Sequence, residues 1–327
     1  MATIKEVAQR AGVSIATISR YFRGTAKVSA ETAKKIRRVT QEMGYTPDFY
    51  ASALKTAQSQ FVCCLIPSIK NLFINSIAES LKNYIKSYKY NIMLALTYND
   101  PEIQQKYVQT FLSLRASAFL YIPDSRLTQD YEVINKNHIY SLQLFLDIDK
   151  NVDSLTIDDT YGTEIAVDHF IKKGYDDVVM IDYANENFFK YRTKGFINAY
   201  EKRGMLPPYA NMIALNSNTS LESAVSGIMD KYPHPAILAV SNEVGMEVIR
   251  QVYERGIKFK EDVSLIIYDD MEIAELMNIT CVGHNKAEIT NCITEMMLDG
   301  IKNTGNGKQK KTEKRVLLPF LIERDSV

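Results

Sequence analysis

Two adjacent carboxylates, Asp269 and Asp270, follow the apolar run VSLIIY, where we expect a strand to end. Such a pair can transfer protons as a general acid and base, or it can accept hydrogen bonds from the hydroxyl groups of a sugar. Proton transfer has little support, because the sequence contains no G-x-G-x-x-G, P-loop, H-E-x-x-H or G-x-S-x-G motif. We therefore expect a protein that is not an enzyme and whose carboxylate pair accepts hydrogen bonds from hydroxyl groups.

Histidine and cysteine give no sign of a metal site or a nucleophile. The four histidines are scattered without metal-ligand spacing, and we expect His169 to be a packed side chain rather than a base. The four cysteines form no C-x-x-C pair, and Cys63 and Cys64 are adjacent in an apolar run. Reduced, buried thiols in a cytoplasmic protein are expected, with no cofactor and no metal.

The composition, 46% hydrophobic and 24% charged, is that of an ordinary globular protein. The sequence has no window of 18 or more apolar residues, so we expect no membrane partner. Its first residues are polar and begin a helical pattern, so we expect no signal peptide.

The charged residues are unevenly divided along the chain. Residues 1–60 carry ten Lys and Arg against four Asp and Glu, a net charge of +6, whereas residues 61–327 carry 29 against 35, a net charge of −6. A basic segment joined to an acidic body is typical of a protein that binds a polyanion at one end. The run KKIRR alone would indicate only a solvated helix face, so its structural setting decides between the two interpretations.

The first residues predict two short helices joined by a turn. Thr3 and Glu6 have the spacing of a capping box, and Gly12 fits the left-handed residue that ends a helix. Ser14 fits the cap of a second helix, and a third is expected over 29–44. Geometry alone would allow an ordinary helical hairpin, but the neighbouring positive charge favours a helix-turn-helix that contacts phosphate groups. Apolar residues recur at helical spacing at Ile4, Val7, Ala8 and Ala11.

After residue 60, apolar runs alternate with amphipathic segments. Continuous apolar strands between helices indicate parallel sheets covered on both faces. About 268 residues exceed one comfortable hydrophobic core, so we expect an α/β fold with two doubly wound subdomains. A ligand would bind in a cleft beyond the carboxyl ends of their strands. The expected strands are FVCCLIP, NIMLALTY, AFLYIP, YSLQLFL, DVVMIDY, NMIALN, AILAVSN and VSLIIYDD.

The segments ATIKEVAQRAGVSIATISRYFRG and VSAETAKKIRRVTQEMGYTPD resemble the N-terminus of LacI/GalR-type transcriptional repressors almost residue for residue. The resemblance continues to LPFLIERDS and so covers nearly the whole chain. It implies a helix-turn-helix domain at 1–47, a hinge helix at 48–59 and an effector-binding and dimerisation part at 60–327 with a periplasmic-binding-protein-like fold. In that fold the first lobe would hold about 60–157 and 287–313, and the second about 158–286 and 314–327.

The resemblance places the second helix in the major groove of DNA, where its N-terminal residues reach base edges. Ile15 and Ala16 match two positions that help to choose the operator; both are apolar here, so they can contact thymine methyl groups but cannot form bidentate hydrogen bonds. Arg20 matches an arginine suited to guanine, with a plain phosphate contact as the alternative. Arg23 stands where many relatives have asparagine and contributes only its charge. The other expected DNA-binding residues are Thr3, Ser14, Thr17 and Ser19.

The segment TPDFYASALKTAQSQ resembles the hinge of the family, a short helix that orders on operator DNA and inserts a leucine into the minor groove. Pro47, Ala51 and Leu54 match the pattern Y-x-P-N-x-x-A-R-x-L, and Leu54 takes the place of the inserted leucine. Asp48 and Ser52 replace its asparagine and arginine, so one contact to the minor groove or a phosphate is missing.

Five residues are carried over to an effector site. The family's R-x-x-G-[FY] segment is matched in YRTKGFINAY, which makes Arg192 a polar clamp. Asp269 matches the aspartate of G-[FY]-D-D, and Asn242 matches the asparagine of A-N-D. Phe73, in a segment that departs from the family's N-P-F-F pattern, is expected to stack on a sugar ring, and Asp158 to border the cleft. Each of these residues has an alternative role in a surface salt bridge or a strand-end cap.

The sequence thus predicts a homodimeric, sequence-specific DNA-binding repressor, controlled by a small sugar-like effector in the cleft. A sugar-binding receptor with the same body is one alternative, and the basic N-terminal segment argues against it. A metabolic enzyme is another, and the absence of a nucleotide-binding fingerprint argues against that. Whether the effector releases the DNA or enables binding is left open.

Overall fold

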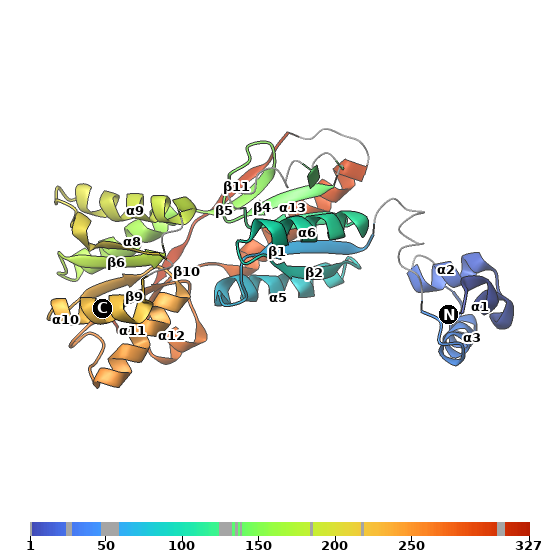
Figure 1. The fold of residues 1–327 in the computed structure, drawn as a ribbon, viewed down its shortest axis with the longest axis horizontal. Coiled ribbons are helices and arrows are strands. Elements are labelled where there is room, and N and C mark those ends of the chain that lie inside the picture. Colours follow the sequence, from blue (N-terminus) through green and yellow to red (C-terminus); the bar gives the residue numbers. More distant parts are fainter. Residues whose placement is uncertain are drawn as a thin grey trace. The chain divides into compact units, whose positions relative to one another are not determined.

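The computed structural model describes residues 2–23, 28–46, 59–123, 133–134, 137, 139–183, 186–216, 219–305 and 311–327. The chain divides into two compact units, Met1–Ser59 and Gln60–Val327, which we call the head and the body (Figure 1). The expected hinge helix, including Leu54, lies outside the described residues except for Ser59.

The head contains three described helices, α1 (Ile4–Ala11), α2 (Ile15–Arg23) and α3 (Ala30–Glu42). The predicted capping box starts α1: Thr3 N–H donates to Glu6 Oε2 at 2.7 Å, and Glu6 N–H donates to Thr3 Oγ1 at 3.3 Å. Gly12 ends α1 at φ 63°, a left-handed conformation that a side chain would strain. These local signals produce the predicted helix-turn-helix.

A small apolar cluster holds the three helices of the head together. Every helix contributes to it, and α2 does so through Ile18, which packs with Ala8 and Val13 as its position on the helix predicts. The opposite face of α2 is therefore left outside the cluster. Its buried members are Val7, Ala8, Ala11, Ile18, Ile36 and Val39.

The body has two lobes, each built on a six-stranded sheet (Figure 1). Lobe 1 has the strand order β11-β5-β4-β3-β1-β2, with every pair parallel. Lobe 2 has the order β12-β10-β9-β8-β6-β7, parallel except that β12 is antiparallel to β10. The strands of lobe 1 are β1 (Phe61–Ile66), β2 (Asn91–Leu96), β3 (Ala118–Tyr121), β4 (Tyr140–Leu144), β5 (Asp153–Ile157) and β11 (Lys314–Leu317). Those of lobe 2 are β6 (Val178–Tyr183), β7 (Met212–Leu215), β8 (Ala236–Ala239), β9 (Ser264–Tyr268), β10 (Thr280–Gly283) and β12 (Phe320–Ile322).

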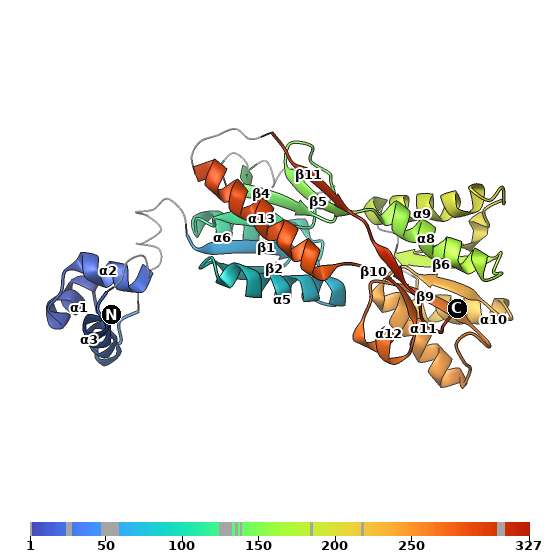
Figure 2. The same ribbon diagram turned by 180° about the vertical axis from the view of Figure 1, so that it is seen from behind.

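Helices cover both faces of each sheet, as the continuous apolar strands predict. In lobe 1, α5 (Leu72–Lys86) and α13 (Lys286–Gly305) pack on one face and α6 (Pro101–Ser113) on the other. In lobe 2, α8 (Asp159–Lys172) and α9 (Glu186–Glu201) cover one face (Figure 2). The other face is covered by α10 (Leu221–Lys231), α11 (Asn242–Arg255) and the short α12 (Glu272–Leu276); a 3₁₀ turn, η2, lies at Tyr209–Asn211.

The chain passes between the lobes three times, after β5, after β10 and after β11. The expected lobe boundary before residue 314 is wrong. The strand β11 lies in the sheet of lobe 1, where Lys314 is paired with Ser154 and Leu317 with Ile157. Parallel pairing with β5 satisfies the backbone of this edge segment, so the last passage falls between Leu317 and Phe320.

The cysteines lie in the body as free thiols. Cys63, Cys64 and Cys281 are buried, and burial raises the pKa of the Cys64 thiol to about 12, so it stays protonated. In the described part of the chain, no helix is both long and apolar enough to cross a membrane.

Candidate DNA-binding surface and effector site

The first turn of α2 presents a mixed polar and apolar surface on the head. Ser14, Ile15 and Ala16 are exposed, whereas Ile18 faces the apolar cluster. Ile15 is 39% exposed, and an apolar group on the first turn of a recognition helix is suited to the methyl group of thymine. The surface is therefore available for base contacts at the positions expected from the sequence.

Arg20 is exposed on α2 and forms no ion pair or hydrogen bond with the described residues. Two other arginines of the head are engaged by one carboxylate: Arg10 Nη2 lies 3.6 Å from Glu42 Oε2, and Arg38 Nε lies 3.5 Å from Glu42 Oε1. Arg20 therefore keeps its donors for an external partner, whether guanine or phosphate.

The remaining polar residues predicted to bind DNA have local partners. Thr3 is held in the capping box, and the Thr17 N–H donates to Ser14 Oγ at 3.1 Å, so Ser14 caps α2. Ser19 is half-buried, and the side chain of Arg23 lies outside the described part. The structure thus gives Thr3, Ser14 and Thr17 a helix-capping role, while their contacts to DNA stay predictions.

A cavity of about 340 Å³ lies in the body between the two lobes. Its lining comes mostly from residues that follow the carboxyl ends of the parallel strands, where ligands bind in doubly wound folds. Lobe 1 contributes mainly apolar groups and lobe 2 all of the charged ones. The residues are Pro67, Ser68, Asn71, Phe73, Ile74, Asn99, Ile122, Phe145, Ile157, Asp159, Asp182, Tyr183, Phe188, Arg192, Val240, Ser241, Asn242, Glu243, Tyr268, Asp269 and His284.

Arg192 is fixed at the centre of the lobe 2 side. Its Nε donates to Asp159 Oδ1 at 3.3 Å, and its Nη1 donates to Asp182 Oδ2 at 3.0 Å and to the carbonyl oxygen of Val240 at 2.9 Å. The guanidinium also lies over the ring of Tyr268, 4.8 Å from its centroid. None of these contacts uses Nη2, which is left to donate to a ligand.

The close packing of α8 on α9 brings Asp159 to Arg192. Gly195, one turn after Arg192, makes this approach possible, because a Cβ atom at that position would clash with the carbonyl oxygen of Thr160 on α8. The glycine in the sequence YRTKGF therefore sets the short distance between α8 and α9 that lets Arg192 reach Asp159.

Burial and charge act in opposite directions on this group of side chains. Burial disfavours the charged form of Arg192, but the carboxylates of Asp182 and Asp159 outweigh it and raise the pKa of the guanidinium. Burial raises the pKa of Asp182, and Arg192 opposes that rise. The arginine therefore stays charged and favours the ionised form of Asp182.

Asp269 follows β9 and is oriented by a histidine from the neighbouring strand. Its Oδ1 lies 2.8 Å from His284 Nε2, and both side chains are buried. The imidazole also contacts the ring of Phe73, with centroids 4.9 Å apart, so the pair touches an aromatic side chain of lobe 1. Asp270 faces elsewhere and accepts a hydrogen bond from Arg324 Nη1 at 2.8 Å.

Asn242 begins α11 and lines the cavity with its amide group. The residue is only 3% exposed, yet neither its Oδ1 nor its Nδ2 has a hydrogen-bond partner within the described structure. His284 Nδ1 is likewise buried without a partner among the described residues. Buried polar atoms are costly unless they are paired, so both groups are suited to a polar ligand.

Four of the five expected effector residues line this cavity, namely Phe73, Arg192, Asn242 and Asp269. Asp158 does not. It caps α8 and accepts a hydrogen bond from the Tyr161 N–H at 2.9 Å, while the next residue, Asp159, enters the helix and reaches Arg192. The aspartate that lines the cavity is thus Asp159, one residue after the expected Asp158, because the capping side chain of Asp158 turns back onto its own helix.

Known proteins resemble the chain over almost its full length. Residues 3–48 match the family "Bacterial regulatory proteins, lacI family", and residues 167–327 match "Periplasmic binding protein-like domain". The HTH-type transcriptional regulator DegA of Bacillus subtilis (strain 168) is 27% identical over 99% of this chain and 97% of its own. The match to the lacI family therefore covers the N-terminal helices, and the likeness to DegA extends it over the whole chain.

Two solved structures show the same fold. The Lac repressor dimer bound to operator and the anti-inducer ONPF has a TM-score of 0.76 at 19% identity, covering 99% of this chain and 98% of that one. The transcriptional regulator CelR in complex with cellobiose has a TM-score of 0.71 at 20% identity, covering both chains completely. Both structures show the fold of this chain, an N-terminal helix-turn-helix and a two-lobed body. The match of residues 3–48 and the full-length likeness to regulators such as DegA identify the chain as a DNA-binding transcriptional regulator.

The cavity of this regulator includes residues that sequence reasoning missed. Asp182 and Asp159 were not singled out, and His284 was counted among scattered histidines. A signal was available, because Asp182, Asp269 and His284 each lie at or just after the carboxyl end of a strand in one parallel sheet. Among the described His, Cys, Asp and Glu side chains, no group of three is arranged to hold a metal ion.

Proposed function

We propose that this regulator is a repressor of the LacI type whose affinity for its operator is controlled by a small sugar-like effector bound in the cavity between the lobes. The cavity supplies free donors on Arg192, carboxylates on Asp159 and Asp269, and the unpartnered amide of Asn242. Opposite them lies Phe73, an aromatic surface for the face of a sugar ring. The single observation that carries the proposal is the buried, unsatisfied Asn242 within this set.

The DNA-binding residues we propose are Ile15, Ala16 and Arg20, from the exposed face of α2. Their support is the exposure of Ile15 and Ala16 and the free guanidinium of Arg20 on a head that carries the net charge of +6. Leu54 is proposed as the residue inserted into the minor groove. A regulator of this kind acts on chromosomal DNA, so we place it in the bacterial cytoplasm. We assign it no enzymatic activity.

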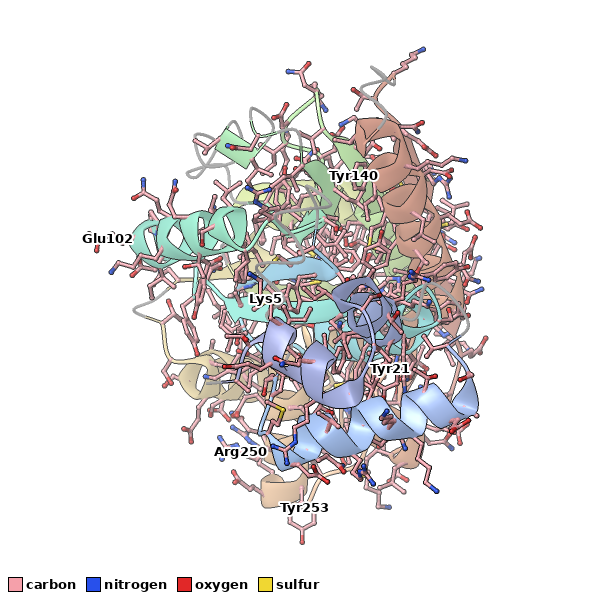
Figure 3. The ribbon with its side chains drawn as sticks, turned by 90° about the vertical axis from the view of Figure 1, so that its right-hand side faces the viewer. Lys5, Tyr21, Glu102, Tyr140, Arg250 and Tyr253 are labelled. Atoms are coloured by element: carbon pink, nitrogen blue, oxygen red, sulfur yellow. The ribbon has the colours of Figure 1, made fainter. Side chains whose placement is uncertain are left out.

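We propose that the regulator acts as a homodimer, because two heads are needed to read two half-sites of an operator. Tyr253 on α11 is 83% exposed and Leu276 on α12 is 79% exposed. Figure 3 shows Tyr253 projecting outward from its helix. In lobe 1, Leu72, Tyr84 and Leu94 are also exposed. A second copy that covered these apolar groups would stabilise the dimer.

Ligand binding tests the effector site. A thermal-shift screen against neutral sugars, sugar phosphates and nucleobases identifies a ligand, and calorimetry then measures its affinity for the wild type and for Asn242→Ala. We expect the Asn242→Ala substitution to weaken binding by about tenfold or more, since a hydrogen bond typically contributes about 0.5–1.5 kcal/mol and several meet here.

A matched substitution controls for general damage. Asn151 is exposed in lobe 1, away from the cavity, so Asn151→Ala should bind the ligand like the wild type. Equal affinity of the Asn242→Ala and wild-type proteins for the ligand would show that the effector binds elsewhere.

A further inference from the structure

The cavity between the lobes has a strongly asymmetric charge. Four carboxylates face it, whereas the described lining holds one arginine and no lysine. All five groups come from lobe 2, and the lobe 1 side is largely apolar. The carboxylates are those of Asp159, Asp182, Glu243 and Asp269.

The positive charge of Arg192 is already compensated. Its guanidinium donates to two carboxylates, Asp182 at 3.0 Å and Asp159 at 3.3 Å. Arg192 therefore offers directional donors through Nη2 but no net positive potential to an incoming anion.

Helix N-termini at the cavity do not reverse this balance. A free N-terminus attracts anions, but Asp159 is the first residue of α8 and Glu243 the second residue of α11. Each of these helices thus has a carboxylate in its first turn, and its N-terminus is already capped, by Asp158 in α8 and by Ser241 in α11. The N-terminus of α5 is capped by Asn71, whose Oδ1 accepts a hydrogen bond from the Ile74 N–H at 3.0 Å.

The remaining hydrogen-bonding capacity suits hydroxyl groups. Asp159 and Asp269 can accept hydrogen bonds, whereas Arg192 can only donate them. The Asn242 amide offers one acceptor and two donors with no partner in the described structure. A ligand rich in hydroxyl groups, which both donate and accept, satisfies all of these groups together.

We propose that the effector is an uncharged polyhydroxylated ring compound and that the cavity carboxylates exclude its phosphate esters and carboxylic acids. The inference rests on the proposed function of this cavity as the effector site. An added phosphate brings one to two negative charges within a few ångströms of these carboxylates. At an effective dielectric constant of about 20, such repulsion lowers an affinity about 100-fold.

Calorimetry with matched pairs of ligands tests the proposal. The probes are D-glucose with glucose 6-phosphate, D-ribose with ribose 5-phosphate, and cellobiose with cellobionic acid. For any of these neutral sugars that binds, we expect the affinity to be at least about 100-fold higher than that of its anionic partner. Asn242→Ala should weaken the binding of the neutral sugar, which ties the measurement to this cavity.

A charge-neutralising substitution supplies the mechanism test. Glu243 accepts a hydrogen bond from Tyr183 Oη at 2.9 Å, and Gln at this position keeps an acceptor of the same shape. Glu243→Gln should therefore reduce the ratio of the affinities for the neutral and the phosphorylated ligand by about tenfold. Glu102→Gln is the matched control, because Glu102 is exposed on α6 (Figure 3) and its removal changes the net charge equally. The Glu102→Gln control should leave this ratio of affinities unchanged.

Two outcomes separate the charge inference from the proposed function. A phosphate ester that binds more tightly than its parent sugar and loses affinity in Asn242→Ala overturns the charge inference while the cavity remains the effector site. If a neutral sugar binds the wild type and Asn242→Ala with the same affinity, the effector does not bind in this cavity, and both proposals fail.

Discussion

Replacement of Arg192 by alanine is expected to destabilise the body strongly and in a pH-dependent way. The arginine side chain is 14% exposed, and its partners Asp159 and Asp182 are 8% and 4% exposed. Removing one member of a buried pair leaves an uncompensated charge, which typically costs about 3–5 kcal/mol. We expect a loss of unfolding free energy of about that size at neutral pH.

The pH dependence follows from the carboxylate of Asp182. Burial already raises the pKa of Asp182, and loss of the guanidinium raises it further. Above the ordinary carboxyl pKa of about 3.9, the folded variant then binds more protons than its unfolded chain. Its unfolding free energy therefore falls as the pH rises through this window. The difference from the wild type should be smaller at pH 5 than at pH 8.

Urea unfolding followed by far-ultraviolet circular dichroism measures both effects. The control is Arg250→Ala, because Arg250 binds Glu247 and Glu254 on the surface of α11, where solvent screens the charges (Figure 3). The reasoning is refuted if Arg192→Ala costs no more stability than Arg250→Ala, or if its cost is the same at pH 5 and pH 8.

Four other substitutions test the head and the cavity. Arg20→Ala should cost about 1–3 kcal/mol on the cognate operator and relax the preference at one base pair in a mobility-shift assay; a uniform loss over all operator variants would identify a phosphate contact. Leu54→Ala should weaken binding to operator more than to random DNA, because only the operator must kink, and equal losses would contradict its insertion. Gly195→Ala should push α9 from α8 and lower ligand affinity in calorimetry, and an unchanged affinity would show that the spacing of Arg192 tolerates a Cβ. His284→Phe keeps the ring packing but removes the hydrogen bond to Asp269, so ligand affinity should fall about tenfold; an unaltered Kd would exclude His284 from the site.

The sequence predicted the head and the class of the body well, because local chemistry decides these features. The capping residue Thr3 and the left-handed Gly12 act within a few residues of their own position. The eight apolar runs are long enough to mark buried strands without knowledge of their neighbours. Four shorter strands gave no such signal: β5, β10, β11 and β12 were missed, and with β11 the lobe boundary near Lys314.

The effector cavity was only partly predictable for a related reason. Arg192 and Asp269 came from a resemblance to short motifs, which contain no information about partners far along the chain. His284 meets Asp269 because β9 and β10 are adjacent and in register, with Tyr268 opposite Val282. Asp159 meets Arg192 because Gly195 lets two helices approach. Register and helix spacing are tertiary properties, so neither contact could be read from local spacing.

The strands β11 and β12 have a consequence for how the protein is made. They form the outer edges of the two sheets, and together they lie within Lys314–Ile322. During synthesis the three described helices of the head are translated before either lobe, whereas each lobe lacks one edge strand until the segment Lys314–Ile322 has been translated. A nascent chain thus acquires its DNA-reading helices long before its ligand-binding lobes are closed. A ribosome that stops early would release a head attached to two open sheets, each with an unpaired edge that invites aggregation or proteolysis.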